Sequence, residues 1–257
     1  QLAGATAAGS LAGTLGWRGA VALTAAVTLL AAFVASRTLH VRPDAARGRF
    51  RVLDAVARYR LVFQNPRALV CYGTVFVEGI AIYGVVPFVG ALLEARRAGG
   101  PAEAGFVIAG LGVGGIAFSL LVAPVMRLFG GYGMMRWGGG LAALGLAGLV
   151  PVAPWPVDAA AFAVLGFGFF MLHSSLQTRA SELAPAARGS AIALHAFFFF
   201  LGQALGPALF ALEQRLLGLG PTLALQAAIM ALAGLVSAHL LLRADRGHAS
   251  RTGHGGG

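Results

Sequence analysis

One carboxylate lies well inside an apolar stretch of this sequence, where a charge is costly. Glu78 stands within residues 75–80 (VFVEGI). A charged side chain at the centre of a membrane costs about 3 kcal/mol or more, so such a residue faces a cavity or the interior of a helix bundle. Glu78 could gain and lose a proton there, with Thr74 one turn away on the same face. Alternatively, Glu78 is structural and hydrogen-bonds a neighbouring helix or lies at a helix break near Gly79.

Two histidines flank a short polar loop further along the chain. His173 lies near the end of one apolar stretch and His195 near the start of the next, with loop 179–188 between them. A short loop keeps both on one side of the membrane, where they could line a solute or proton path or hydrogen-bond at the interface. Ser174 beside His173 also fits nucleophilic catalysis. However, neighbouring helical residues point about 100° apart and no acid orients the histidine, so no enzyme is predicted.

Other polar side chains in the apolar stretches complete the candidate site. Gln203 lies within residues 202–207 (GQALGP), where an amide bonds either a neighbouring helix or a ligand. Cys71 is the single cysteine, which excludes a cysteine-based metal site, and no metal or cofactor is predicted. Glu78 is the predicted proton-coupling residue, and the predicted substrate-cavity residues are Thr74, Tyr83, His173, Gln177, His195 and Gln203.

The elements that must position these side chains are membrane-spanning helices. Hydrophobic residues make up 58% of the 257 positions and charged residues 11%. A soluble domain carries about 25% charged residues, so lipid must solvate this apolar surface. Since a span needs about 20 apolar residues, we expect eight helices, the first one short. They cover residues 1–15, 19–36, 68–93, 104–126, 134–152, 158–178, 189–212 and 221–242.

The arginines predict how these helices are oriented. All 19 basic residues are Arg. Fifteen of them lie in residues 37–67, 127–136, 179–188 and the tail from 243, which alternate along the chain and so share one side. The other four are Arg18, Arg96, Arg97 and Arg215. The positive-inside rule makes the Arg-rich side, with the C-terminus, cytoplasmic. The net charge of +10 therefore reports topology, and no nucleic-acid partner is predicted.

The predicted helix 104–126 contains a glycine motif whose residue types match a nucleotide-binding pattern. Residues 110–115 (GLGVGG) satisfy G-x-G-x-x-G. They lie inside an apolar helix with no preceding strand, so the phosphate-binding geometry is absent. We predict that these glycines serve helix packing.

An internal repeat predicts two related halves. Residues 21–34 (VALTAAVTLLAAFV) and 223–236 (LALQAAIMALAGLV) align without gaps with seven identities. Duplicated halves are typical of transporters, so we expect six helices in each half, with four of them preceding Gln1. The predicted parts are two N-terminal-bundle helices (1–36), an Arg-rich cytoplasmic linker (37–67), a six-helix C-terminal bundle (68–243) and a cytoplasmic tail (244–257). The linker could contain a short amphipathic helix.

The order of several motifs resembles the major facilitator superfamily, especially its bacterial efflux permeases. Residues 9–18, ending in LGWR, resemble the fifth helix and its following turn, and residues 182–191 (ELAPAARGSA) resemble the loop between helices ten and eleven. Residues 166–177 (GFGFFMLHSSLQ) and 200–206 (FLGQALG) are also similar. The resemblance implies twelve helices in two bundles, eight of them present here, with alternating access and proton-driven export. It places the family's loop motif at 128–135, and the associated conformational residues are Arg127, Gly130, Gly131 and Arg136.

The prediction is therefore an all-α integral membrane protein with a major-facilitator-like helix bundle. It moves a small organic solute by alternating access, in proton-coupled efflux. The alternatives are a membrane receptor or assembly subunit without transport and, less favoured, an intramembrane enzyme. The expected partners are the lipid bilayer, the solute and protons. The full-length protein is expected to be a multi-pass monomer of the bacterial cytoplasmic membrane.

Overall fold

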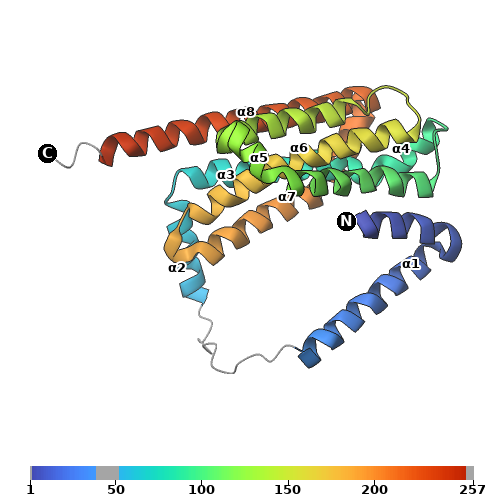
Figure 1. The fold of residues 1–257 in the computed structure, drawn as a ribbon, viewed down its shortest axis with the longest axis horizontal. Coiled ribbons are helices and arrows are strands. Elements are labelled where there is room, and N and C mark those ends of the chain that lie inside the picture. The colour runs from blue at the N-terminus through green and yellow to red at the C-terminus, as the bar shows by residue number, and fades with distance from the viewer. Residues whose placement is uncertain (1, 39–51, 253–257) are drawn as a thin grey trace.

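The computed structural model describes residues 2–38 and 52–252, and these ranges contain helices and no strand (Figure 1). The helices pack side by side into an elongated bundle, and α1 contacts α5 while its second part extends away from the bundle. In chain order they are α1 (Leu2–Thr38), α2 (Val52–Phe63), α3 (Arg67–Val85), the 3-10 turn η1 (Val86–Phe88), α4 (Val89–Ala95), α5 (Pro101–Ala147), α6 (Trp155–Glu182), the 3-10 turn η2 (Pro185–Ala187), α7 (Arg188–Leu217) and α8 (Leu219–Thr252).

Two of these helices are each divided by a glycine. Gly16 in α1 has φ 68° and Gly130 in α5 has φ 62°, a backbone conformation that favours glycine. A straight α5 of 47 residues would be about 70 Å long, more than twice the roughly 30 Å of a bilayer's hydrocarbon core. The turn at Gly130 instead folds α5 into two antiparallel segments, each long enough to cross a membrane.

The apolar stretches predicted from the sequence match these segments apart from differences at helix ends, the largest in α8, which continues to Thr252 where 221–242 was predicted. Six helical stretches among the described residues are long and apolar enough to span a membrane, and the glycine turns explain why eight were predicted. The predicted helix 68–93 is interrupted at η1, where Pro87 removes a backbone donor. The predicted helix 134–152 ends early, at Ala147, because Gly148 and Pro151 follow. Residues 39–51 and 253–257, parts of the predicted linker and tail, lie outside the described residues.

Glycines let both segments of α5 pack closely on α6. A Cβ atom added at Gly110 or Gly114 would overlap the backbone of α6 near Ala159 and Ala163, and one at Gly138 or Gly145 would overlap it nearer Leu172 and Leu165. Contacts run in opposite order along the two segments, which confirms the fold-back at Gly130. The prediction that the glycines of residues 110–115 serve helix packing is also confirmed for Gly110, Gly114 and Gly115.

The outer surface of the bundle is apolar. Leu120, Leu128 and Leu216 are each more than 70% exposed. Such side chains are unfavourable in water and suit contact with lipid tails. The linker helix α2 packs on the bundle through Val62, which is fully buried, while Val56 on the same helix is exposed. The predicted short helix of the linker is therefore present and anchored at one end of the bundle.

Substitution of a packing glycine should destabilise the fold. In Gly114→Ala the new Cβ would overlap the carbonyl oxygen of Ala163 and the backbone of Gly166 and Phe167, and such overpacking typically costs about 1–3 kcal/mol. We expect a lower thermal unfolding midpoint for the full-length protein in detergent. Gly140→Ala, also in α5, is the matched control because a Cβ there meets nothing within 4 Å. Equal midpoints for the two variants would contradict the packing described here.

Candidate functional site

Glu78 of α3 and His173 of α6 form a polar contact between two helices, called here the buried pair. Glu78 Oε2 lies 2.7 Å from His173 Nδ1. The Glu78 side chain has no exposed surface, whereas that of His173 is 18% exposed. The distance is that of a strong hydrogen bond, in which either partner can hold the proton. The second oxygen, Oε1, has no hydrogen-bond partner among the described residues.

A second histidine brings a third helix to the buried pair. The ring of His195 in α7 lies 4.9 Å from the ring of His173. His195 is also buried, and neither of its ring nitrogens has a hydrogen-bond partner in the described part of the chain. Three side chains that can carry protons therefore meet from α3, α6 and α7.

Aromatic rings surround the histidine side of this group. The rings of Phe169 and Phe199 lie 5.1 Å and 4.8 Å from the ring of His173. Tyr83 packs edge-on against both phenylalanines, at 6.4 Å and 5.6 Å between ring centroids. Apolar surroundings strengthen the hydrogen bond of the buried pair, and they raise the cost of leaving either partner charged alone.

Close backbone contact between α3 and α7 determines where Glu78 points. A Cβ on Gly79 would lie 2.5 Å from the carbonyl oxygen of Phe199, and one on Gly206 would lie 2.8 Å from that of Ile80. Gly79 thus faces α7 directly. Because consecutive helical residues are about 100° apart, the preceding side chain, Glu78, turns away from this contact line towards α6.

The other predicted cavity residues lie on the same helices but do not all join the buried pair. Tyr83 joins it through the aromatic rings. Thr74, one turn before Glu78, and Gln203 in α7 are both half-buried. Gln177, one turn beyond the histidine of α6, is exposed. None of these last three hydrogen-bonds the pair, and their role in a cavity stays a prediction.

One detail of the catalytic interpretation was wrong. The sequence indicated that no acid orients His173, whereas Glu78 is hydrogen-bonded to it. The partner was missed because it lies 95 residues earlier in the chain. The Ser174 hydroxyl, however, donates to the carbonyl oxygen of Met171 in its own helix, at 3.4 Å. It makes no hydrogen bond to the histidine, so the contacts of an activated serine are not formed.

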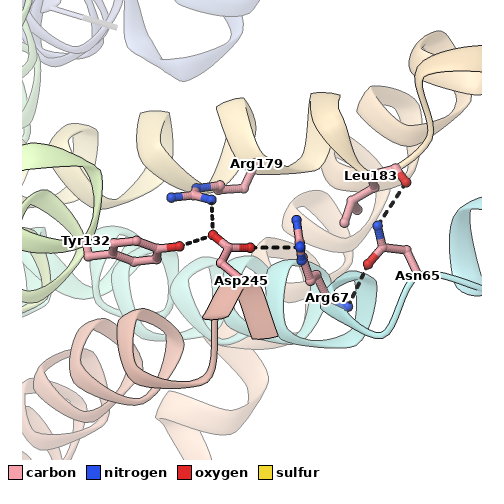
Figure 2. Close-up of polar contacts among 6 residues, drawn as sticks. All are labelled: Asn65, Arg67, Tyr132, Arg179, Leu183 and Asp245. Atoms are coloured by element: carbon pink, nitrogen blue, oxygen red, sulfur yellow. Dashed lines mark hydrogen bonds and ion pairs between the residues drawn. The ribbon is translucent and has the colours of Figure 1, made fainter. Parts of the chain in front are cut away.

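A second polar site joins four helices at one end of the bundle (Figure 2). Asp245 of α8 accepts hydrogen bonds from Tyr132 of α5 and, at 2.7 Å, from Arg179 of α6. It also forms an ion pair at 3.0 Å with Arg67, the first residue of α3. The guanidinium of Arg179 lies over the Tyr132 ring, 4.5 Å from its centroid. We call these four residues the Asp245 cluster.

Contacts beside the Asp245 cluster attach the linker to the same end. The amide of Asn65 donates to the carbonyl oxygen of Leu183 at 3.0 Å, and the backbone N–H of Arg67 donates to Asn65 Oδ1 (Figure 2). Four segments therefore lie together at this end: the linker, the Gly130 turn, the segment after α6 and the end of α8. This is the grouping of Arg-rich loops on which the orientation prediction depends.

The predicted loop motif lies partly at this cluster. Gly130 makes the turn, and a Cβ on Gly131 would lie 3.8 Å from Arg179 Nη2. Arg127 and Arg136 are exposed and lie on opposite sides of the turn. Tyr132 was not among the predicted site residues, although it lies within the predicted motif 128–135.

A third polar contact, at the opposite end of the bundle, was also missed. Asp158 in the first turn of α6 is fully buried, and its Oδ1 lies 3.7 Å from Arg96 Nη1. Arg96 Nη2 also donates to the carbonyl oxygen of Leu149 at 2.6 Å. Glu78 is therefore not the only acid in the bundle interior. Asp158 escaped notice because it begins its apolar stretch and so looked interfacial.

Replacement of Asp245 by an uncharged residue should weaken the Asp245 cluster. Asp245→Asn deletes the charge that Arg67 and Arg179 share, and hydrogen bonds to charged groups are worth about 1.5–3 kcal/mol when little exposed. The thermal unfolding midpoint of the full-length protein should fall. Glu182→Gln is the control, because it removes an exposed carboxylate from the same end of α6. If the control variant lost as much stability, net charge and not the cluster would explain the effect.

A comparison with protein-family models identifies the family of this chain. The family model of the Major Facilitator Superfamily matches residues 1–207. A comparison with curated proteins gives no match. The match covers most of the chain and includes α3, α6 and α7 up to Pro207, the helices that form the buried pair and its surroundings. The chain belongs to the major facilitator superfamily, a family of membrane transporters.

Proposed function

We propose that this transporter couples export of a small organic solute to proton movement, through the buried pair of Glu78 and His173. The observation that carries the proposal is their 2.7 Å contact, inside a bundle where Glu78 has no exposed surface. An isolated charge there would cost several kcal/mol. A carboxylate placed against a histidine can hold or release a proton at a much lower cost.

The protonation states of the buried pair explain how it could work. With one proton between them, the pair has no net charge, whether it is an ion pair or a neutral hydrogen bond. A second proton makes the pair positive, and loss of the shared proton makes it negative. Either net charge is less stable among the surrounding apolar rings than the neutral pair is. Each change of charge can therefore favour a different arrangement of the helices.

The two side chains of the buried pair differ in their exposure to solvent. His173 is 18% exposed and Glu78 is not exposed. We infer that His173 exchanges protons with water and that Glu78 holds the proton during the change of access. His195, whose ring nitrogens are unpaired among the described residues, is placed to receive a proton or a polar group of the solute. Thr74, Tyr83, Gln177 and Gln203 are the proposed solute contacts.

We also propose the orientation that the arginines predict. The end of the bundle with the Asp245 cluster carries the Arg-rich segments, and positive charge favours the cytoplasmic side. This places the C-terminus inside and the Arg96–Asp158 contact on the outer side of a bacterial cytoplasmic membrane. The efflux direction and the assignment of α1 to an N-terminal bundle are supported by the resemblance to efflux permeases.

Loss of the exchangeable carboxyl group should abolish coupling. We expect Glu78→Gln in the full-length protein to lose gradient-driven efflux at least about 100-fold, the lower limit for removing a proton-transfer group. The readout is efflux of ethidium, a fluorescent organic cation, from cells and from proteoliposomes with an imposed proton gradient. His173→Gln should lose coupling in the same way, because its amide cannot carry the proton.

The matched control is Glu94→Gln, which removes an exposed carboxylate from α4, the continuation of the same span. It should transport like the unmodified protein. Equal thermal unfolding midpoints would show that Glu78→Gln is folded. Gradient-driven flux that persists in a folded Glu78→Gln protein would contradict the coupling role. Dye movement that no variant and no gradient changes would favour the alternative of a membrane protein without transport.

A further inference from the structure

A groove opens on the outer surface between the second segment of α5 and α8. Its volume is about 490 Å³, and Arg136, Leu235, Val236, His239 and Leu240 line it. All five side chains are exposed. The groove is separate from the buried pair, because none of its lining residues contacts Glu78, His173 or His195 in the described chain.

The groove lies directly beside a tight crossing of the two helices. A Cβ on Gly139 would lie 2.7 Å from the Cα of Gly234 and from the carbonyl oxygen of Met230. The backbones therefore touch at this point, as small residues allow in membranes. Residues flanking the crossing, including Leu235 and Val236, form the wall of the groove on the α8 side.

The two basic side chains in the groove have no acidic partner among the residues that the structure describes. Neither Arg136 nor His239 forms an ion pair with any residue that the structure describes. Asp245, the acid at this end of α8, is already bonded to Arg67, Tyr132 and Arg179. An arginine on the lipid-facing surface needs an anion or water, and it extends its side chain towards the headgroups to find one.

The depth of the groove suits a phospholipid headgroup. Arg136 lies one turn, about 6 Å, beyond Tyr132, and His239 lies about 9 Å before Asp245 along its helix. Both basic groups are thus just inside the polar end of the bundle. Leu235 and Val236 precede His239 along α8 and continue the groove away from the polar end, where an acyl chain can lie, and Leu240 lies beside His239.

We propose that this groove binds one anionic phospholipid of the leaflet at the Asp245 end. The phosphate would lie between Arg136 and His239, and one acyl chain would lie along Leu235 and Val236. Basic pockets between membrane helices bind anionic headgroups by this chemistry. The bound lipid would supply the negative charge that the described protein lacks at Arg136, and it would hold α5 and α8 together beside their glycine crossing.

The test uses the full-length protein in nanodiscs of phosphatidylcholine containing a minor fraction of phosphatidylglycerol. Native mass spectrometry after release into detergent should show one retained phosphatidylglycerol in the unmodified protein. Arg136→Gln should weaken this retention about fivefold, the factor expected for one basic side chain. Val236→Trp fills the groove without changing any charge and should weaken retention similarly.

Arg58→Gln, on the exposed surface of α2 at the same end, is the matched control and should retain the lipid. Unchanged thermal unfolding midpoints in lipid-free detergent would show that each variant is folded. Retention of phosphatidylglycerol by Arg136→Gln at the unmodified level would overturn the proposal. So would equal retention of phosphatidylcholine, or a loss in Arg58→Gln as large as in Arg136→Gln. None of these readouts depends on transport, so failure of the lipid site leaves proton coupling untouched.

Discussion

A polar side chain inside the hydrocarbon core has to find its partner within the protein, because no water is there to solvate it. The polar contacts of this chain are arranged by that constraint. Glu78 is paired with His173 between α3 and α6, and Gln226 of α8 donates to Glu213 of α7 at 2.5 Å. The buried pair joins helices that are distant in sequence, whereas the second contact joins the consecutive helices α7 and α8. Each contact therefore favours one arrangement of the bundle, although Glu78 Oε1 and Gln226 Oε1 have no hydrogen-bond partner among the described residues.

Glycines make these polar contacts possible. Lipid tails are as apolar as leucine, so helices in a membrane gain little from hiding apolar surface and depend on close packing. Contacts such as Gly79 on Phe199 and Gly139 on Gly234 bring backbones together without a side chain between them. The positions of the polar groups follow from these crossings. A small change of a crossing would move Glu78 relative to His173, which is how a change of protonation and a change of access could be linked.

The sequence predicted the membrane class, the helical stretches and the burial of Glu78, because each depends on local composition and on the cost of charge in lipid. The two segments on either side of the fold-back at Gly130 were predicted as two separate helices, 104–126 and 134–152. The partners could not be predicted. His173, Tyr132 and Asp245 each contact residues on other helices, and the rotation of a helix about its axis is set by tertiary packing. An apolar stretch with weak amphipathicity carries little information about that rotation, so Asp158 looked interfacial, and Asp245 fell in the predicted cytoplasmic tail (244–257).

We propose that Glu78 exchanges a proton while its side chain stays buried against His173. Difference infrared spectroscopy of the full-length protein in membranes, taken between acid and alkaline pH, tests this claim without any solute. We expect a protonated-carboxyl band that changes with pH, disappears in Glu78→Gln, shifts in His173→Gln and persists in Glu94→Gln. A pH-dependent carboxyl band that survives unchanged in Glu78→Gln, or the absence of such a band in the unmodified protein, would contradict it.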